Sequence, residues 1–254
     1  MNEGIKVILA PEQLGVLWGI PLTNTLLMSW VSLGVLVLIA LIVGGRIKLV
    51  PSRFQTILEE LFGYVYDYIT ETLESRDMAR KFFPLLITIF LFIFTSNMLE
   101  FIPGVGSIGF FSAGGGPSSG GQAFVPLFRS ANTDLNVTLA LALISFLVIE
   151  ITGILAVGAI KYGGKFLNVH SPMGFVIGII EFFSELARLV AFSFRLFGNI
   201  FAGEVLIAVA IYFLPYLGPV PFMAFEVFVG FIQAAIFSLL TLFFIKIAIM
   251  EPSH

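Results

Sequence analysis

Residues 173–214 read MGFVIGIIEFFSELARLVAFSFRLFGNIFAGEVLIAVAIYFL, a stretch that is mainly apolar and contains no proline. As a single α-helix, these 42 residues would extend about 63 Å at ~1.5 Å per residue. The hydrocarbon core of a bilayer is only about 30 Å thick, so a perpendicular helix would need about half that length. The sequence therefore predicts either a helix that breaks near Gly198 or Gly203, or one that crosses the membrane at a steep tilt.

The whole chain shares this apolar character. Of its 254 residues, 58% are hydrophobic and only 11% are charged, whereas an ordinary soluble domain carries about 25% charged residues. Lipid must therefore be the solvent for much of the chain. The absence of cysteine excludes disulfides, thiolate metal sites and cysteine nucleophiles. No basic tract indicates a nucleic-acid partner.

Apolar runs predict an all-α membrane protein with about five membrane-crossing helices in a single membrane domain, residues 24–254. The predicted crossing segments are 24–44, 82–102, 135–160, 173–214 and 220–250. Residues 52–75 differ, because apolar residues recur there at helical spacing between carboxylates. That pattern predicts an amphipathic interfacial helix, lying on the membrane or packed on a partner. Residues 103–133 include a stretch rich in Gly and Ser and are expected to form an exposed loop.

Basic residues outside the predicted spans indicate the orientation. If the N-terminus is outside, nine Lys and Arg residues lie in inner segments and only two, Lys6 and Arg129, lie in outer ones. Basic residues are in excess on the cytoplasmic side of membrane proteins. We therefore expect an external N-terminal segment at residues 1–23, an external loop at 103–133 and a cytoplasmic C-terminus.

Ionisable residues within the predicted spans are the candidates for function, because each costs about 2.5–3.5 kcal/mol at the centre of a membrane helix. These residues are Glu150, Glu181, Arg188, Arg195, Glu204 and Glu226. On a helical wheel, Glu181, Ser184, Arg188 and Asn199 all lie within about 40° of Arg195. Glu204 lies on the opposite face, about 180° away. On the last helix, Glu226 and Gln233 are seven residues apart and share a face.

This arrangement predicts two polar tracks with Arg195 between them. Arginine does not lose its proton in proteins, so Arg195 can block a proton but cannot relay one. Carboxylates in a low-dielectric environment can load and release protons. The alternative interpretation is a buried structural ion pair, and Glu150 has no assigned partner. No cluster of His, Asp and Glu has metal-binding spacing, so we expect neither a metal nor a cofactor.

Several motifs, in their order along the chain, resemble the a subunit of rotary F-type ATP synthases. The main motif is Arg195-Leu196-Phe197-Gly198-Asn199 followed by Ala202-Gly203-Glu204. Further matches are Asn97-Met98-Leu99-Glu100-Phe101-Ile102-Pro103, Asp134-Leu135-Asn136-Val137-Thr138 and the segment from Gln233 to Thr241. The resemblance covers roughly residues 24–250 and is firmest from 173 to 245. This chain differs from some members of the family in having Glu226 in place of His and Ala191 in place of a polar residue. Glu204, where mitochondrial members often have His, favours a bacterial origin.

The resemblance implies a role for each matching position. Arg195 would face the rotating ring of c subunits. The half-channel that opens to the outside would contain Glu204, Glu226, Gln233 and Asn199, with Asn97 and Glu100 at its mouth. The half-channel that opens to the cytoplasm would contain Glu181 and Ser184. The last two helices would form a long tilted hairpin against the c-ring, which would account for their length.

The function implied by the resemblance is that of a proton-translocating stator subunit that itself catalyses no reaction. Its partners would be a c-ring with a membrane carboxylate, b-type peripheral stalk subunits and the lipid of a bacterial plasma membrane. The alternatives are a sodium-translocating version of the same subunit, a component of a secondary cation antiporter, and a purely structural membrane anchor. An antiporter often shows duplicated halves with broken helices, and the sequence shows no such repeat.

Overall fold

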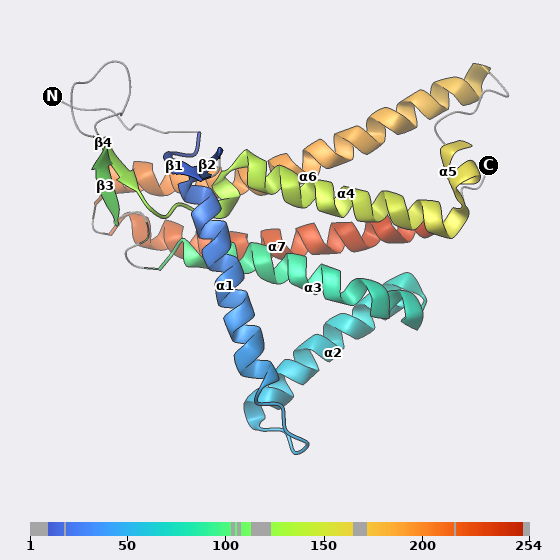
Figure 1. Cartoon of the computed structure of the whole chain (residues 1–254), viewed down its shortest axis with the longest axis horizontal. Coiled ribbons are helices and arrows are strands. Elements are labelled where there is room, and N and C mark those ends of the chain that lie inside the picture. Colours follow the sequence, from blue (N-terminus) through green and yellow to red (C-terminus); the bar gives the residue numbers. More distant parts are fainter. Residues whose placement is uncertain are drawn as a thin grey trace. The chain divides into compact units, whose positions relative to one another are not determined.

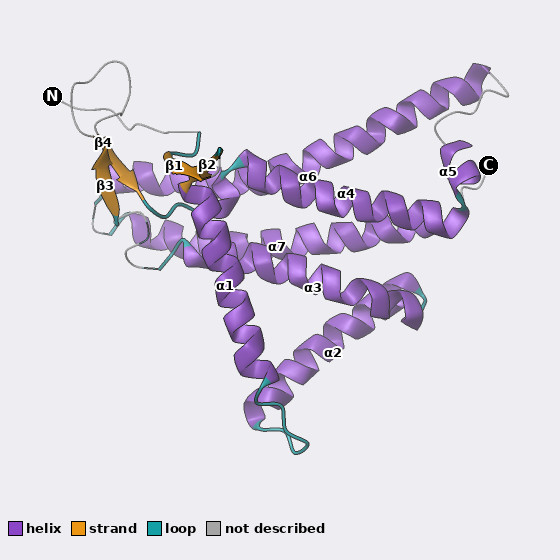
Figure 2. Ribbon diagram, viewed as in Figure 1, coloured by secondary structure: helices purple, strands orange, loops and turns teal. Residues whose placement is uncertain are grey.

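The structure is a computed structural model that describes residues 10–17, 19–102, 105, 108–112, 123–164, 172–215 and 217–250. Helices dominate this part of the chain, with two short β-hairpins (Figures 1 and 2). In chain order the elements are β1 (Gln13–Leu17), β2 (Ile20–Thr23), α1 (Asn24–Gly44), α2 (Arg53–Leu73), α3 (Arg76–Leu99), β3 (Gly109–Ser112), β4 (Ala123–Pro126), the 3₁₀ helix η1 (Ala131–Thr133), α4 (Leu135–Val157), α5 (Ala159–Gly164), α6 (Pro172–Phe213) and α7 (Pro219–Ile249).

Five helices in the described part of the chain are long and apolar enough to cross a membrane: α1, α3, α4, α6 and α7. Large apolar side chains on these helices are exposed in the isolated chain, for example Leu41, Leu155 and Phe228. Such a surface is expected where lipid is the solvent. The prediction of an all-α membrane protein with five crossing helices is therefore confirmed.

Helix α6 is continuous over 42 residues and does not break at Gly198 or Gly203. A break would expose backbone N–H and C=O groups, which hydrocarbon cannot satisfy. By contrast, α4 ends at Val157, three residues before the end of the predicted third span. Gly158 follows it with a φ of +94°, a conformation that favours glycine and redirects the chain into α5.

The predicted outer segments contain structure that the sequence did not indicate. Strands β1 and β2 pair antiparallel within residues 1–23, and β3 and β4 pair antiparallel within the loop at 103–133. Residues 1–9 and 18 of the N-terminal segment, and 103, 104, 106, 107 and 113–122 of the loop, lie outside the described residues. Strands of four or five residues give too little alternation for a sequence pattern to reveal them.

The chain divides into two compact units. Unit 1 comprises Met1–Ala40, Leu91–Thr138 and Arg195–Ala234, and unit 2 comprises Leu41–Phe90, Leu139–Phe194 and Ala235–His254. Within unit 1, the Thr25 hydroxyl donates to Oδ2 of Asp134 at 2.7 Å, joining the starts of α1 and α4. Oδ1 of Asp134 accepts from the backbone N–H of Asn136 at 2.8 Å and so caps α4.

Unit 2 is organised around α2, the predicted amphipathic helix. Ser52 caps its N-terminus by accepting from the backbone N–H of Gln55 at 3.4 Å. One face of α2 packs through Ile69 into an apolar cluster with Ala79, Leu86 and Leu242. A second apolar stripe, beside this face, is exposed and contains Phe54, Ile57, Leu61, Tyr64 and Tyr68. The helix therefore uses one face to join α3 and α7 and leaves the other uncovered.

Candidate functional site

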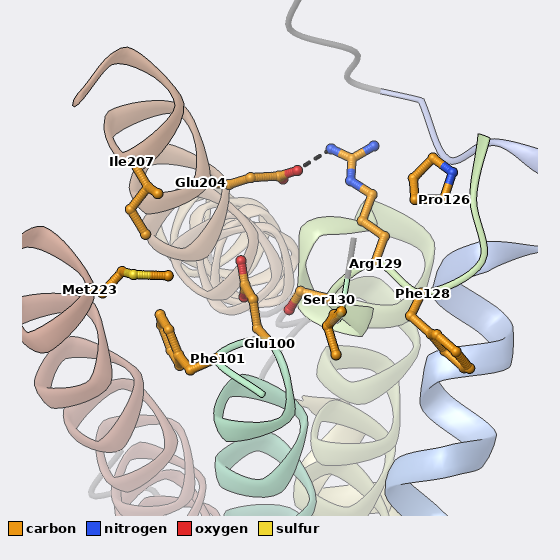
Figure 3. A pocket seen from close by; sticks show the side chains of 10 residues that line it. Glu100, Phe101, Pro126, Phe128, Arg129, Ser130, Glu204, Ile207 and Met223 are labelled. Atoms are coloured by element: carbon orange, nitrogen blue, oxygen red, sulfur yellow. Dashed lines mark hydrogen bonds and ion pairs between the residues drawn. The ribbon is translucent and has the colours of Figure 1, made fainter. Parts of the chain in front are cut away.

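A polar pocket of about 330 Å³ lies in unit 1 (Figure 3). We call it the acidic pocket, after the two carboxylic side chains that it contains, Glu100 and Glu204. It is lined by Glu100, Phe101, Val105, Pro126, Phe128, Arg129, Ser130, Glu204, Ile207 and Met223. These residues come from the end of α3, the segment between β4 and η1, α6 and the start of α7. The pocket thus brings together two predicted site residues that are 104 positions apart in the sequence.

Glu204 forms an ion pair in this pocket with Arg129. Nη2 of Arg129 donates to Oε2 of Glu204 at 3.1 Å, shown as a dashed line in Figure 3. The Arg129 side chain is 11% exposed and that of Glu204 is 36% exposed, so one end of the pair is accessible to solvent. Nη1 of Arg129 also donates to the backbone oxygen of Ala10 at 3.4 Å. In the sequence, Arg129 stands out only as an outer basic residue, and nothing near it predicts this contact.

Glu100 follows the last residue of α3 and points into the pocket (Figure 3). Burial, reinforced by the negative charge of Glu204, raises the pKa of Glu100 to about 8, although the charge of Arg129 opposes this shift. Much of Glu100 is therefore protonated at neutral pH, whereas Glu204 has a cation beside it. A carboxylic group that its surroundings keep neutral near pH 7 is typical of sites that transfer protons.

Glu226 on α7 lies against Gly203 on α6. A Cβ atom at position 203 would overlap the carboxyl group of Glu226, so only glycine leaves room for it. The Glu226 side chain is buried, and its Oε1 has no hydrogen-bond partner among the described residues. Four residues earlier on α6, Nδ2 of Asn199 donates to Oε1 of Gln233 at 2.7 Å. These two contacts place polar side chains between α6 and α7 throughout this part of unit 1.

Asn97 is buried in a hydrogen-bond network and does not line the pocket. Its Nδ2 donates to the backbone oxygen of Gly230 at 3.0 Å, and its Oδ1 accepts from Nδ2 of Asn132 at 2.7 Å. The network therefore joins α3, α7 and η1. Asn132 is a further buried polar residue, and it was not among the predicted site residues.

Arg195 is exposed on α6, and its side chain makes no hydrogen bond or ion pair with any other residue in the described part of the chain. Its neighbour Leu196 is fully buried, so α6 packs inward on that side while the guanidinium faces away from the chain. An unpaired arginine within an apolar helix is costly in a membrane. The described residues supply no counter-charge for it.

In unit 2, α6 carries Glu181, which is half-buried, and Ser184, which is exposed. Glu185, which was not among the predicted site residues, has its Oε2 2.6 Å from Nη1 of Arg188 in a largely buried ion pair. Arg188 also lies 4.0 Å above the ring of Phe244. The helical wheel placed Arg188 and Arg195 on one stripe, but packing buries the first and leaves the second exposed.

Glu150, for which the sequence offered no partner, accepts a hydrogen bond from the Tyr162 hydroxyl at 3.0 Å. Tyr162 lies on α5 directly against Gly153 of α4, where a Cβ atom would overlap its ring. Burial and the nearby charge of Glu150 raise the pKa of Tyr162. The contact secures α5 to the end of α4 within unit 2.

Five helices of the described residues are long and apolar enough to span a membrane, and ionisable side chains lie within several of them, which defines a multi-pass membrane protein. The family model for the ATP synthase A chain matches residues 26–246. The chain is 31% identical over 222 residues to ATP synthase subunit a of Campylobacter concisus (strain 13826), covering 87% of this chain and 88% of that protein. It is 32% identical over 219 residues to ATP synthase subunit a of Campylobacter jejuni subsp. jejuni serotype O:23/36 (strain 81-176), covering 86% and 87%. The chain belongs to the ATP synthase A chain family.

Membership of this family confirms the resemblance seen in the sequence. The protein is a multi-pass membrane component of an F-type ATP synthase, in which it has a stator role. The orientation of its termini, its transported ion, its partners within the complex and the roles of its individual polar residues remain predictions.

Proposed function

We propose that the chain translocates protons between two half-channels and the c-ring of its ATP synthase, with Arg195 as the barrier between them. The observation that carries this proposal is the guanidinium of Arg195 on α6, which is exposed and has no hydrogen-bond or ion-pair partner among the described residues. A cation in hydrocarbon needs a counter-charge. A carboxylate on a neighbouring ring of c subunits would supply this counter-charge. Each step of the ring would bring a different carboxylate to Arg195.

The outer half-channel begins at the acidic pocket. Glu100 and Glu204 receive protons there, and Glu226 and the Asn199–Gln233 pair continue the path between α6 and α7. Oε1 of Glu226 and Nε2 of Gln233 are buried without a hydrogen-bond partner among the described residues. Buried polar atoms in native proteins are nearly always satisfied. Oε1 of Glu226 can therefore accept from water or take up a proton in transit, and Nε2 of Gln233 can donate to water, which supports a polar path here.

The inner half-channel would begin at Glu181 and Ser184 on the N-terminal half of α6. Ser184 is exposed and Glu181 is half-buried, so both are accessible from outside the chain. The buried pair of Glu185 and Arg188 lies one turn further along the same helix. The two charges of this pair compensate each other, so we assign the pair a structural role. Glu181 would then be the residue that releases the proton.

In this mechanism a proton enters from outside and neutralises a c-ring carboxylate, which can then rotate into lipid. After nearly a full turn, another carboxylate releases its proton toward Glu181. Arg195 attracts the freed carboxylate and, because it retains its own proton, prevents direct leakage between the paths. A membrane potential supplies about 2.3 kcal/mol per charge per 100 mV, so several protons combine for one ATP. Peripheral stalk subunits of the b type would hold the chain against rotation.

The test replaces Arg195 by Ala in the complete complex, reconstituted into vesicles. ATP synthesis driven by a proton gradient should be abolished. Passive proton leakage should rise once the ATP-forming part of the complex is removed, because the barrier is gone. Arg80→Ala removes an exposed guanidinium from the start of α3 and is the matched control, which should synthesise ATP normally. Normal synthesis by the Arg195→Ala complex would refute the proposal.

A further inference from the structure

Asn132 of η1 and Asn97 of α3 form a buried amide pair in unit 1. Asn132 is 0% exposed and Asn97 is 1% exposed, so both are shielded from solvent. Nδ2 of Asn132 donates to Oδ1 of Asn97 at 2.7 Å and to the backbone oxygen of Ile93 at 3.5 Å. A side-chain amide carries its acceptor and its donors on two different atoms of one planar group. Because Asn132 occupies Oδ1 of Asn97, the Nδ2 of Asn97 is turned toward α7.

The donor side of Asn97 meets α7 at Gly230. Nδ2 of Asn97 donates to the Gly230 backbone oxygen at 3.0 Å. A Cβ atom at position 230 would lie 3.1 Å from the Cβ of Asn97, so glycine allows α3 to approach α7 this closely. Inside an α-helix a carbonyl oxygen already accepts from the N–H four residues later, and its second lone pair is free for another donor. The bond from Asn97 is therefore not needed to complete α7, and it fixes the position of α7 against α3.

Gly230 lies between the two polar side chains of α7 that contact α6, four residues after Glu226 and three before Gln233. At about 100° per residue, these three positions lie within about 60° of one another on the helix. Glu226 fits against α6 only where Gly203 leaves room for it. Oε1 of Gln233 accepts from Asn199. A shift of α7 by one residue would turn both side chains by about 100° and move them by about 1.5 Å, which would break both contacts.

We propose that Asn132 is a positioning residue for the outer half-channel: by holding Asn97 against Gly230, it fixes α7 so that Glu226 and Gln233 lie against α6. This inference rests on the proposed function, because it assumes that protons pass between α6 and α7. Asn97, which the family resemblance places at the mouth of the half-channel, belongs to the same positioning pair. Neither amide carries a proton along the path.

The experiment uses the complete ATP synthase in membrane vesicles and measures the register of α6 and α7 without requiring transport. The chain contains no cysteine, so cysteines introduced at positions 199 and 233 are its only thiols. Nδ2 of Asn199 and Oε1 of Gln233 are 2.7 Å apart, so a short thiol-specific cross-linker should join the two cysteines only while this register is kept. In Asn132→Leu, which has a similar volume but no donor, the initial cross-linking rate should fall about tenfold, the factor by which about 1.4 kcal/mol of lost hydrogen bonding shifts an equilibrium. Asn136→Leu, at an exposed asparagine near the start of α4, is the matched control and should leave the rate unchanged.

A double variant tests whether Asn132 acts through Asn97. Asn97→Leu alone should lower the cross-linking rate to a similar extent, and the Asn97→Leu/Asn132→Leu double variant should lower it no further. Additive losses in the double variant would overturn the inference. Failure of both Asn132→Leu and Asn132→Ala to assemble would also overturn it, because Asn132 would then be needed for folding and not for the position of one helix.

Proton pumping separates this inference from the proposed function. With Asn199 and Gln233 intact, ATP-driven pumping by the Asn132→Leu complex should fall together with the cross-linking rate. Slower cross-linking with normal pumping would support the inferred position of α7 and refute the proton path between α6 and α7. An unchanged cross-linking rate would overturn the inference whether or not the complex pumps protons.

Discussion

Gly203→Ala tests the contact between α6 and α7 most directly, because the added methyl group would overlap the carboxyl group of Glu226. Forcing extra volume into a packed site costs about 1–3 kcal/mol. At about 1.4 kcal/mol per tenfold change, the native position of Glu226 becomes roughly 5- to 140-fold less favoured. We therefore expect the variant to lose stability and to transport protons much more slowly.

The matched control is Gly198→Ala on the same helix, where an added Cβ meets nothing within 4 Å in the isolated chain. Alanine favours a helix interior by up to about 1 kcal/mol relative to glycine, and both variants share this gain. The difference between their unfolding free energies, measured on the purified chain in detergent, therefore isolates the overlap. ATP-driven proton pumping by the Gly203→Ala complex gives the second measurement. Equal stability of the two variants together with normal pumping would refute the proposed packing of Glu226.

Two further predictions concern stability. Gly153→Ala should destabilise unit 2 by about 1–3 kcal/mol because its methyl group would overlap the Tyr162 ring. In the Gly153→Ala/Tyr162→Ala double variant this overlap cost should disappear. A loss of stability unchanged from that of Gly153→Ala alone would contradict the predicted overlap. The pKa of Glu100 is about 8 in the folded chain, against an ordinary value of 4.5, so folding favours its neutral form. The contribution of Glu100 to the free energy of unfolding should therefore be complete below pH 4.5 and lost as the pH rises toward 8. The thermal unfolding temperature, measured between these pH values, should fall with rising pH in the wild type and change less in Glu100→Gln. Equal slopes of unfolding temperature against pH in the two proteins would show that Glu100 is not the group responsible.

The fold was largely predictable because each crossing helix must satisfy its backbone internally and present apolar side chains to lipid. That requirement leaves a long apolar run in the sequence, as at residues 173–214. Arg195 was visible for the same reason, since a charge is conspicuous in such a run. A helical wheel, however, gives only the direction of a side chain. It could not show that Arg188 is covered by Phe244 while Arg195 is exposed.

The contacts that the sequence did not reveal are those between distant segments. Arg129 lies outside the helices and meets Glu204 across 75 positions of sequence, with no local pattern to connect them. Glu185 could have been found, because a Glu and an Arg three residues apart on a helix lie side by side. Asn132 could not have been found in this way, because its contact with Asn97 forms only when α3 and η1 come together in the fold.

The network around Asn97 has a consequence for the order in which the chain enters the membrane. Ribosomes add about 5–20 residues per second. Gly230, which accepts from Asn97, is made 133 positions later, and Asn132 only 35 positions later. At those rates the acceptor on α7 is synthesised about 7–27 s after Asn97, whereas the amide of Asn132 follows within about 2–7 s. The nascent chain can therefore satisfy Asn97 with an early partner, before the helix that completes the network has been made.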